Sequence, residues 1–353
     1  MSVRFSIHIV TWNSERFLPA LFQSIRQQNY TQSDIIVVDN ASEDKTLSIV
    51  EAMCPSATVL RNPRNMGFAR AHNQAIELVK KRNDHGATRY DGVIILNPDI
   101  ILMPETINII AKGFLQYPQC GSIGVPLYKA HDRDEEGLPL EQSRFEYFDS
   151  LGIQITRAHQ FQDISSGVID RGEILKDQFV FGISGACCVY RWDAIKELMK
   201  LDGEFFDEAF FSYKEDIDVA WRLQLRGWRS LRLFQTRVYH YRGVGASFQH
   251  SIIDQIKNRY HRSRRIKQMS YRNHFATIVK NESLINLFLA IPWIASYETT
   301  KFIAILFTEP STIKGLLSFF KELPALIRKR LVIQSTACIR SSAIRSWYTQ
   351  QRS

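Results

Sequence analysis

Several sequence features common in nucleotide-binding and membrane proteins are missing from this chain of 353 residues. No GxGxxG follows the first strand-like segment and no GxxxxGK[ST] occurs, which argues against dinucleotide redox chemistry and P-loop hydrolysis. None of the apolar stretches near the C-terminus reaches the ~18 uninterrupted residues of a membrane span. The first residues, MSVRFSIHIV, lack the basic region and long apolar core of a signal peptide, so we expect them to form a strand.

Cysteine is also scarce. The five cysteines show no zinc-ligand spacing, and Cys187 and Cys188 are adjacent inside an apolar run. An odd, scattered set is typical of reduced thiols in a cytosolic protein.

The positive charge is concentrated in the C-terminal part of the sequence. Residues 251–353 hold 17 Lys/Arg and 5 Asp/Glu, whereas the preceding residues hold 28 basic and 31 acidic side chains. Such asymmetry indicates an anionic partner, either membrane phospholipid or nucleic acid. The apolar stretches in this segment are interrupted by Pro292, Glu298, Lys301 and Pro310. We therefore expect amphipathic helices lying on a membrane face; a helical appendage with a solvated charged face is the alternative.

The first half of the chain alternates between short apolar runs and helical patterns. This alternation predicts an α/β fold with a mostly parallel central sheet covered on both faces. Ser42 is expected to cap one helix and Pro104 to occupy the first position of another. The polar segment 126–180 is expected to be a surface insertion or irregular hairpin region. The predicted strands are 5–10, 35–38, 57–60 and 93–96, and the predicted helices are 14–28, 44–53, 69–81 and 104–117.

Acidic residues stand where two of these strands end. Asp39 follows the second strand, and Asp99 follows the strand at 93–96. Ligands of open α/β sheets bind beyond the carboxyl ends of the strands, where Thr11–Asn13 should also lie. Asp39 is then expected to accept a hydrogen bond from a nucleobase N–H or a ribose hydroxyl. The alternative is that Asp39 caps the next helix through the segment Asp39–Ser42. A nucleotide diphosphate bound without a glycine-rich loop needs a divalent cation, which Asp99 is placed to hold, with Asn97 supplying a neutral oxygen. A plain turn is the alternative for Asp99.

A second acidic cluster opens the pattern KEDIDVAWRLQLRG. Glu215, Asp216 and Asp218 crowd the start of a predicted helix, where carboxylates also favour the helix dipole. Their crowding beside an aromatic run should raise a carboxyl pKa, which suits a general base. Arg222 is four residues beyond Asp218, so a salt bridge between them is expected.

Other candidate residues follow later strands. His240 ends the strand-like segment RVYH and precedes Gly243 and Gly245. Only in combination with Asp99 is it a candidate metal ligand, or a candidate hydrogen-bond donor to the diphosphate. In the segment NPRNMGFARAHN, the candidate residues are Asn65, Gly67 and Arg70. Gly67 would allow a close approach to the backbone, and Arg70 could pair with a phosphate. Arg70 could equally be a solvated helix charge.

The ordered set of motifs is similar to glycosyltransferase family 2, most of all to its rhamnosyltransferase-like bacterial members. The resemblance covers roughly residues 3–245 and implies a GT-A fold, a nucleotide-sugar donor, a divalent cation (Mg²⁺ or Mn²⁺) and an inverting transfer. The motifs in question are VTWNSERFL, VVDNASED, NMGFARAHN, ILNPD, SGACCVYR, FFSYKEDIDVAWRLQLRGW and VYHYRG.

The resemblance assigns roles to individual residues. Asp216 matches the catalytic base, in a pair with Glu215, and Asp99 matches the last residue of the metal-binding acidic motif, with His240 able to complete the site. The first acidic residue of that motif is replaced by Asn97, which bears on the strength of metal binding. The remaining expected contacts to the nucleotide sugar are Thr11, Asn13, Asp39, Asn40, Asn65, Gly67, Arg70 and Asn97.

Together these features predict a transferase domain at residues 1–250 and a basic, membrane-associated helical extension at 251–353. The expected reaction moves a sugar, with rhamnose from dTDP-rhamnose first and UDP-sugars next, to a saccharide or lipid-linked acceptor for bacterial surface polysaccharide. The expected location is the cytoplasmic face of the inner membrane. A homo-oligomer is possible, and no nucleic-acid partner is expected. The alternatives are a nucleotidyltransferase of similar fold and a non-catalytic membrane or nucleic-acid scaffold.

Overall fold

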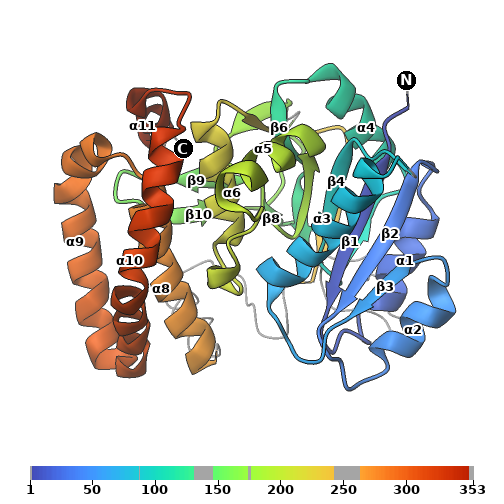
Figure 1. The fold of residues 1–353 in the computed structure, drawn as a ribbon, viewed down its shortest axis with the longest axis horizontal. Coiled ribbons are helices and arrows are strands. Elements are labelled where there is room, and N and C mark those ends of the chain that lie inside the picture. The colour runs from blue at the N-terminus through green and yellow to red at the C-terminus, as the bar shows by residue number, and fades with distance from the viewer. Residues whose placement is uncertain (1, 87, 131–145, 174–175, 242–262, 350–353) are drawn as a thin grey trace.

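A central eight-stranded sheet organises the first 240 residues of the computed structural model, which describes residues 2–86, 88–130, 146–173, 176–241 and 263–349 (Figure 1). The strand order is β11-β13-β6-β12-β4-β1-β2-β3. Strands β4, β1, β2 and β3 are parallel, as are β13 and β6, while β12 and β11 run antiparallel to their neighbours. The predicted mostly parallel α/β sheet is confirmed. The strands are β1 Phe5–Thr11, β2 Ser33–Asp39, β3 Thr58–Arg61, β4 Gly92–Leu96, β6 Cys120–Gly124, β11 Gln178–Val180, β12 Cys187–Arg191 and β13 Arg229–Arg232.

Helices cover both faces of this sheet, because its strands are apolar on both sides. One face packs on α1 (Leu18–Arg26), α2 (Thr46–Met53) and α4 (Thr106–Gln116). The opposite face packs on α3 (Phe68–Asp84), α5 (Trp192–Asp202) and α6 (Glu215–Leu225). This two-sided burial keeps the strand ends fixed, and the candidate site residues follow those ends.

Two predicted helix starts are wrong. Helix α2 begins at Thr46, four residues after Ser42, and the Oδ1 atom of Asp44 accepts from the Thr46 N–H at 3.0 Å. The Ser42 hydroxyl instead donates to Asp39. Helix α4 begins at Thr106, so Pro104 precedes it in a turn.

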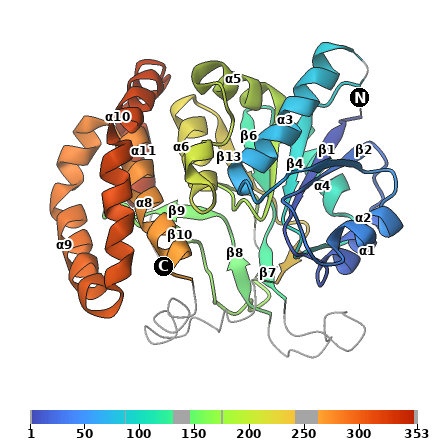
Figure 2. The ribbon, with the colours of Figure 1, turned by 60° about the horizontal axis from the view of Figure 1, so that its bottom comes forward.

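A second, four-stranded sheet lies at one end of the molecule, with β7 and β8 at the lower edge of Figure 2. Its order is β5-β14-β7-β8, and a separate hairpin pairs β9 with β10. Part of the segment expected to be a surface insertion is therefore core, since all of β8 is buried. The sequence DRDEEG at 132–137 lies outside the described residues. The strands are β5 Ile100–Leu102, β7 Leu127–Lys129, β8 Phe148–Ser150, β9 Ile153–Ile155, β10 Phe161–Asp163 and β14 Val238–His240.

The C-terminal helices form a layer beside α6 (Figure 1, orange to red). Helix α6 lies between this layer and the sheet, and ten of its eleven residues are buried. The predicted helical extension is confirmed from residue 264 onward, and its boundary at residue 250 lies outside the described residues. Within the described ranges, no helix is both long enough and apolar enough to cross a bilayer. These helices are α8 Arg264–Asn281, α9 Leu284–Thr308, α10 Ile313–Ser335 and α11 Ser341–Thr349, with a short 3-10 turn, η2, at Pro310–Thr312.

Candidate active site

The ends of β1 and β2 hold a fixed, buried carboxylate. The parallel register places Thr11 beside Asp39, as the strand-end argument predicted. The hydroxyls of Thr11 and Ser42 donate to Asp39 Oδ1 at 2.9 and 2.6 Å, and the Ser42 N–H donates to Oδ2 at 3.0 Å. Three donors within hydrogen-bond distance keep this carboxylate, which is 1% exposed, in one orientation.

The two neighbouring asparagines brace the loops around Asp39. Asn13 has a φ of +49°, and its Oδ1 atom accepts from the Glu43 N–H at 2.9 Å. Asn40 is buried; its Oδ1 atom accepts from Asn62 at 2.9 Å and its Nδ2 atom donates to the Gly67 carbonyl at 3.3 Å. Both lie at the predicted place, and their side chains connect loop to loop.

The segment after β3 packs against the loop that precedes α6. Asn65 Oδ1 accepts from the Gly67 N–H at 2.9 Å. Gly67 has a φ of +83°, and a Cβ atom there would lie 2.6 Å from the Phe211 carbonyl oxygen. Only glycine fits at this position, because any larger side chain would collide with Phe211. The Arg70 Nε atom is 3.6 Å from Glu208 Oε2, and the Arg70 side chain is half exposed.

The four-stranded sheet brings Asp99 and His240 together. Asp99 immediately precedes β5, whose first residue, Ile100, pairs with His240 at the end of β14. His240 Nε2 lies 3.4 Å from Asp99 Oδ1, and His240 Nδ1 lies 2.8 Å from Asp149 Oδ2. Burial lowers the pKa of His240, but Asp99 and Asp149 outweigh it and raise that pKa to about 9.

Asp149 is a candidate residue that the sequence did not reveal. It is fully buried in β8, within a polar segment that carries no motif. A carboxylate on one nitrogen of an imidazole fixes the ring and leaves the other nitrogen free to bind a metal. His240 Nε2 faces Asp99, so a divalent cation held by these two side chains would replace the proton on Nε2. Asn97 directly follows β4, and its N–H donates to the Ala186 carbonyl at 2.9 Å.

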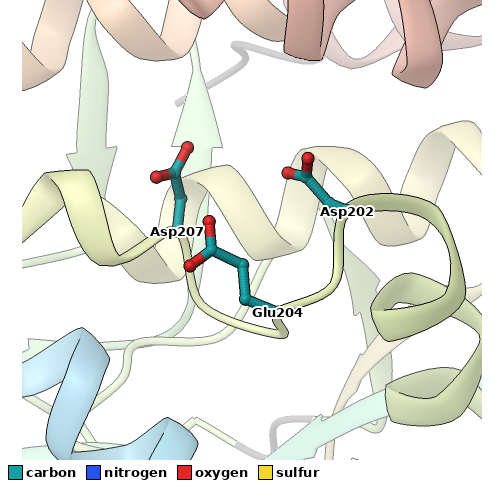
Figure 3. A group of neighbouring side chains, drawn as sticks. All are labelled: Asp202, Glu204 and Asp207. Carbon is teal, nitrogen blue, oxygen red and sulfur yellow. The ribbon is translucent and has the colours of Figure 1, made fainter.

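A different acidic group does not fit a metal. Asp202, Glu204 and Asp207 have carboxylate oxygens within 4.8 Å of one another, between α5 and the 3-10 turn η1, Glu208–Phe210 (Figure 3). The Lys329 ammonium already lies 2.7 Å from Glu204 and 2.8 Å from Asp207. We interpret this group as a set of structural ion pairs.

The Glu215–Asp216 pair opens helix α6. Asp216 Oδ2 accepts from the Gly185 N–H at 3.0 Å and Oδ1 accepts from the Ile217 N–H at 2.8 Å, which fixes the carboxylate beside the SGA segment. Burial raises the pKa of Asp216. Burial first, and the neighbouring Asp216 second, raise the pKa of Glu215, whose Oε2 atom has no hydrogen-bond partner among the described residues. These environments match the predicted tuning of a general base.

Asp218 does not belong to this pair. It is fully buried and lies 2.8 Å from Arg222, which confirms the predicted salt bridge. It also accepts from Lys280 and Asn281 of α8, each at 2.8 Å. Its role is structural.

A cavity of about 510 Å³ lies away from all these residues. It is lined by Leu225 at the far end of α6 and by residues of α9, α10 and α11. At a helical rise of ~1.5 Å per residue, Leu225 is ~15 Å along the helix from Glu215. The cavity is therefore separate from the Glu215–Asp216 pair.

Comparison with known proteins agrees with this arrangement. The family model described as glycosyl transferase family 2 matches residues 6–199, more than half of the chain. The chain belongs to glycosyl transferase family 2. A second model, glycosyl transferase family group 2, matches residues 169–307. The chain is thus an enzyme that transfers a sugar from a nucleotide sugar, and the nucleotidyltransferase and scaffold alternatives are not supported.

Curated relatives within the family are distant. An N-acetylglucosaminyl-diphospho-decaprenol L-rhamnosyltransferase of Mycobacterium tuberculosis is 27% identical over 235 residues, covering 65% of this chain and 71% of that protein. Rhamnosyltransferase WbbL of Escherichia coli is 23% identical over 239 residues, covering 66% and 81%.

Solved structures show the same fold. The TarS fragment 1–349 of S. aureus, in complex with UDP-GlcNAc, has a TM-score of 0.52 at 17% identity over 98% of this chain and 92% of that chain. GalNAc-T7 with UDP, GalNAc and Mn²⁺ has a TM-score of 0.52 at 12% identity over 79% and 49%. The GT-A fold is therefore confirmed.

Proposed function

We propose that this transferase moves rhamnose from dTDP-rhamnose to a hydroxyl of a lipid-linked saccharide, with inversion, in bacterial surface polysaccharide synthesis. The names of the two rhamnosyltransferase relatives support the donor sugar, and the name of the mycobacterial protein supports an acceptor that carries a diphospho-lipid. The observation that carries the reaction is the Asp216 carboxylate, held by two backbone N–H groups at the start of α6.

The donor is proposed to bind across the ends of β1, β2 and β4. Asp39 and Thr11 form the floor of this site, and Trp12, 57% exposed between Thr11 and Asn13, is available to stack on the nucleobase. Asn40 and Asn65 hold the surrounding loops, while Arg70 is the nearby cation for the phosphates. The nucleotide part of the site is thus built from two loops already tied together.

Asp99 and His240 would hold the divalent cation, and Asp149 would orient His240. When bound, the cation offsets the charge that develops on the leaving diphosphate. With Asn97 in place of a second acidic residue, the chain offers one carboxylate and one imidazole here, which predicts weaker metal binding than two carboxylates would give.

Asp216 performs the proton transfer in this scheme. Its carboxylate accepts the proton of the acceptor hydroxyl while that oxygen forms a bond to the anomeric carbon. The bond from the anomeric carbon to the diphosphate oxygen breaks on the opposite side, and the nucleoside diphosphate leaves with the electron pair. Gly185 leaves room above the carboxylate, since a Cβ atom there would lie 3.3 Å from Asp216 Cβ.

The test is transfer by purified protein from dTDP-rhamnose, UDP-GlcNAc and GDP-mannose to a GlcNAc-diphosphate lipid, with Mn²⁺. We expect dTDP-rhamnose to react fastest with inversion, and Asp216→Asn to lower kcat by about 10²–10⁴-fold without loss of donor binding. Asp84→Asn, an exposed carboxylate on α3, is the matched control. Faster transfer from another donor would refute the rhamnosyl assignment, and an active Asp216→Asn would remove this base.

We further propose that α9 and α10 dock on an anionic membrane. Large apolar side chains are exposed along α9, among them Leu284 at 70%, Phe288 at 74% and Phe307 at 81%. Exposed cations on α10, at Lys314, Lys321 and Arg328, complement anionic lipid. The GlcNAc-diphosphate acceptor would then meet the enzyme at the bilayer surface.

Vesicle sedimentation tests this proposal. We expect binding to phosphatidylcholine vesicles containing phosphatidylglycerol, and much weaker binding for the double variant Phe288→Ser, Phe307→Ser. The control is Leu115→Ser, which removes an exposed leucine of α4. Equal loss in the control, or no loss in the double variant, would contradict docking through α9.

A further inference from the structure

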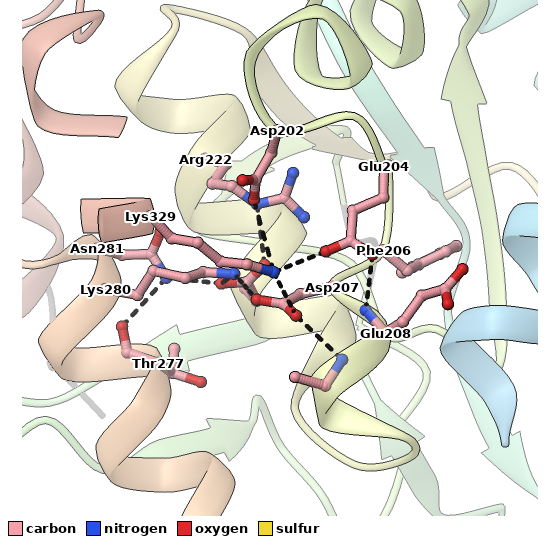
Figure 4. A network of polar contacts seen from close by, with 12 residues as sticks. Asp202, Glu204, Phe206, Asp207, Glu208, Arg222, Thr277, Lys280, Asn281 and Lys329 are labelled. Carbon is pink, nitrogen blue, oxygen red and sulfur yellow. Dashed lines mark hydrogen bonds and ion pairs between the residues drawn. The ribbon is translucent and has the colours of Figure 1, made fainter. Parts of the chain in front are cut away.

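A buried lysine of α8 connects the C-terminal helices to the catalytic segment. Lys280 is fully buried, and its Nζ atom lies 2.6 Å from Asp207 Oδ2 (Figure 4). The same atom lies 2.8 Å from Asp218 Oδ1. These two carboxylates bracket residues 208–217, the segment that contains Glu215 and Asp216. One ammonium group therefore fixes both ends of the catalytic loop.

Further cations and donors complete the network. Lys329 of α10 bridges Glu204 and Asp207, and Arg222 contacts Asp218 and the Phe205 carbonyl. A buried ionised carboxylate is stable only when it is paired, and removal of one partner leaves an uncompensated charge. The carboxylates of Asp218 in α6, and of Glu204 and Asp207 in the loop between α5 and η1, thus depend on side chains supplied by α8 and α10.

Helix α8 also holds the backbone of the same loop. The Asn273 Nδ2 atom donates to the carbonyls of Phe210, Ser212 and Tyr213 at 3.0, 3.0 and 2.8 Å. Phe211, Tyr213 and Lys214 have φ values of +60°, +71° and +71°. Non-glycine residues in such conformations cost about 1–3 kcal/mol each and persist only where their surroundings enforce them. The geometry before Glu215 is therefore imposed largely by α8.

We propose that Lys280 is a positioning residue for sugar transfer. It sets the distance between Asp207 and Asp218, and it neutralises carboxylate charge that would otherwise act on the catalytic pair from the same helix. Lys280 does not touch substrate in this scheme; it acts through the loop that presents Asp216. The inference rests on the proposed role of Asp216 and adds a catalytic dependence on the C-terminal helices.

The charge around the pair predicts the direction of a pH effect. Without Lys280, the negative charge of Asp218 is no longer neutralised by this cation. That charge then favours the protonated forms of the neighbouring Glu215 and Asp216. The pKa values of both are already raised, so the acidic limb of the kcat profile should move to higher pH. Among the residues that the structure describes, the other charged or titratable groups that face the pair are Lys214 from the preceding loop, Asp163 of β10, and Cys188 and Tyr190 of β12.

The test compares Lys280→Met with the double variant Lys280→Met, Asp218→Asn, in the full chain. Transfer is measured with a donor and acceptor that give turnover in the wild type, together with donor KM, the pH profile of kcat and urea unfolding. For Lys280→Met we expect kcat to fall by about tenfold or more, donor KM to stay unchanged, and the acidic limb to move to higher pH. The double variant should recover part of kcat and return the limb toward that of the wild type, because it removes the Asp218 charge that Lys280 no longer neutralises, while Lys329 still pairs with Asp207. Lys80→Met, an exposed lysine of α3, controls for loss of a positive charge.

The outcomes separate four cases. A folded Lys280→Met with wild-type kcat and pH profile overturns the proposal. A loss of kcat with no shift of the limb and no recovery in the double variant also overturns it, since Lys280 then only fills space. If Lys280→Met does not fold, the test relies on the double variant. A double variant that loses as much kcat as Asp216→Asn would then refute the electrostatic role of Lys280. A wild-type protein inactive with every nucleotide sugar would instead refute the proposed function.

Discussion

Replacing Gly67 with alanine tests whether the donor loops and the catalytic loop form one packed unit. Gly67 has φ +83° and ψ 172°, a backbone region that is essentially restricted to glycine. Its neighbours tie the two loops together, since Asn40 donates to the Gly67 carbonyl and the Ala69 N–H donates to the Phe211 carbonyl at 3.2 Å. A methyl group at this position therefore disturbs both.

Two contributions set the size of the effect. The backbone conformation costs about 1–3 kcal/mol for a residue other than glycine. The new Cβ atom would lie 2.6 Å from both Cδ2 and the carbonyl oxygen of Phe211, and overpacking of this kind costs about 1–3 kcal/mol. Because one of the two close atoms belongs to the backbone, rotation of a side chain cannot relieve the contact. We expect Gly67→Ala to lower the free energy of unfolding by about 2–6 kcal/mol.

Gly203→Ala is the matched control. Gly203 ends α5 with φ +77° and ψ −12°, and a Cβ atom there would have no heavy atom within 4 Å. Its cost should be the left-handed penalty alone, about 1–2 kcal/mol. Urea unfolding of both variants, with calorimetric titration of dTDP and UDP, measures stability and donor binding. Equal destabilisation of the two variants, or undiminished nucleotide binding by Gly67→Ala, would refute the packing argument.

Three further predictions follow from the same site. Because a base must be ionised to act and the pKa of Asp216 is raised, kcat should fall with decreasing pH at a midpoint above the ordinary carboxyl value of about 4, as measured in steady-state pH profiles. The raised pKa of Glu215 means that its ionised form destabilises the fold, so Glu215→Gln should raise the free energy of unfolding more at alkaline than at acidic pH; a pH-independent effect would contradict this. Asp149→Asn should weaken Mn²⁺ binding by about 10–100-fold in calorimetry, because the Asp149 carboxylate orients His240. Unchanged Mn²⁺ affinity would argue against His240 as a metal ligand.

The strand ends could be predicted because the necessary information is local. Two apolar runs of four residues, one ending directly before Asp39 and one ending three residues before Asp99, reveal both the strand and the acidic side chain after it. Parallel topology then brings the strand ends to one edge. The same holds for Glu215 and Asp216, whose position at a helix start follows from the pattern of α6.

Long-range contacts account for what the sequence did not show. Asp149 meets His240 only because β8 and β14 both join β7, and nothing in the polar segment marks it. The close approach of Phe211 to Gly67 joins residues 144 positions apart, so the sequence does not reveal this packing reason for the glycine. The local pattern at Ser42 permits either a helix cap or a contact within the loop. In the folded protein the Ser42 hydroxyl contacts Asp39, so the predicted cap is not formed.

The charge asymmetry has a second meaning in the folded protein. The surplus of the C-terminal residues was interpreted as an attraction to an external anion, yet Lys280 and Lys329 neutralise Glu204, Asp207 and Asp218 of the transferase domain. Part of the contrast between the two segments is thus internal complementarity. Only the exposed cations of the extension remain for a membrane, so the salt dependence of vesicle binding should reflect fewer charges than the sequence surplus suggests. The extension therefore turns part of its positive charge toward the transferase domain, and only its outer face would be available to the proposed membrane.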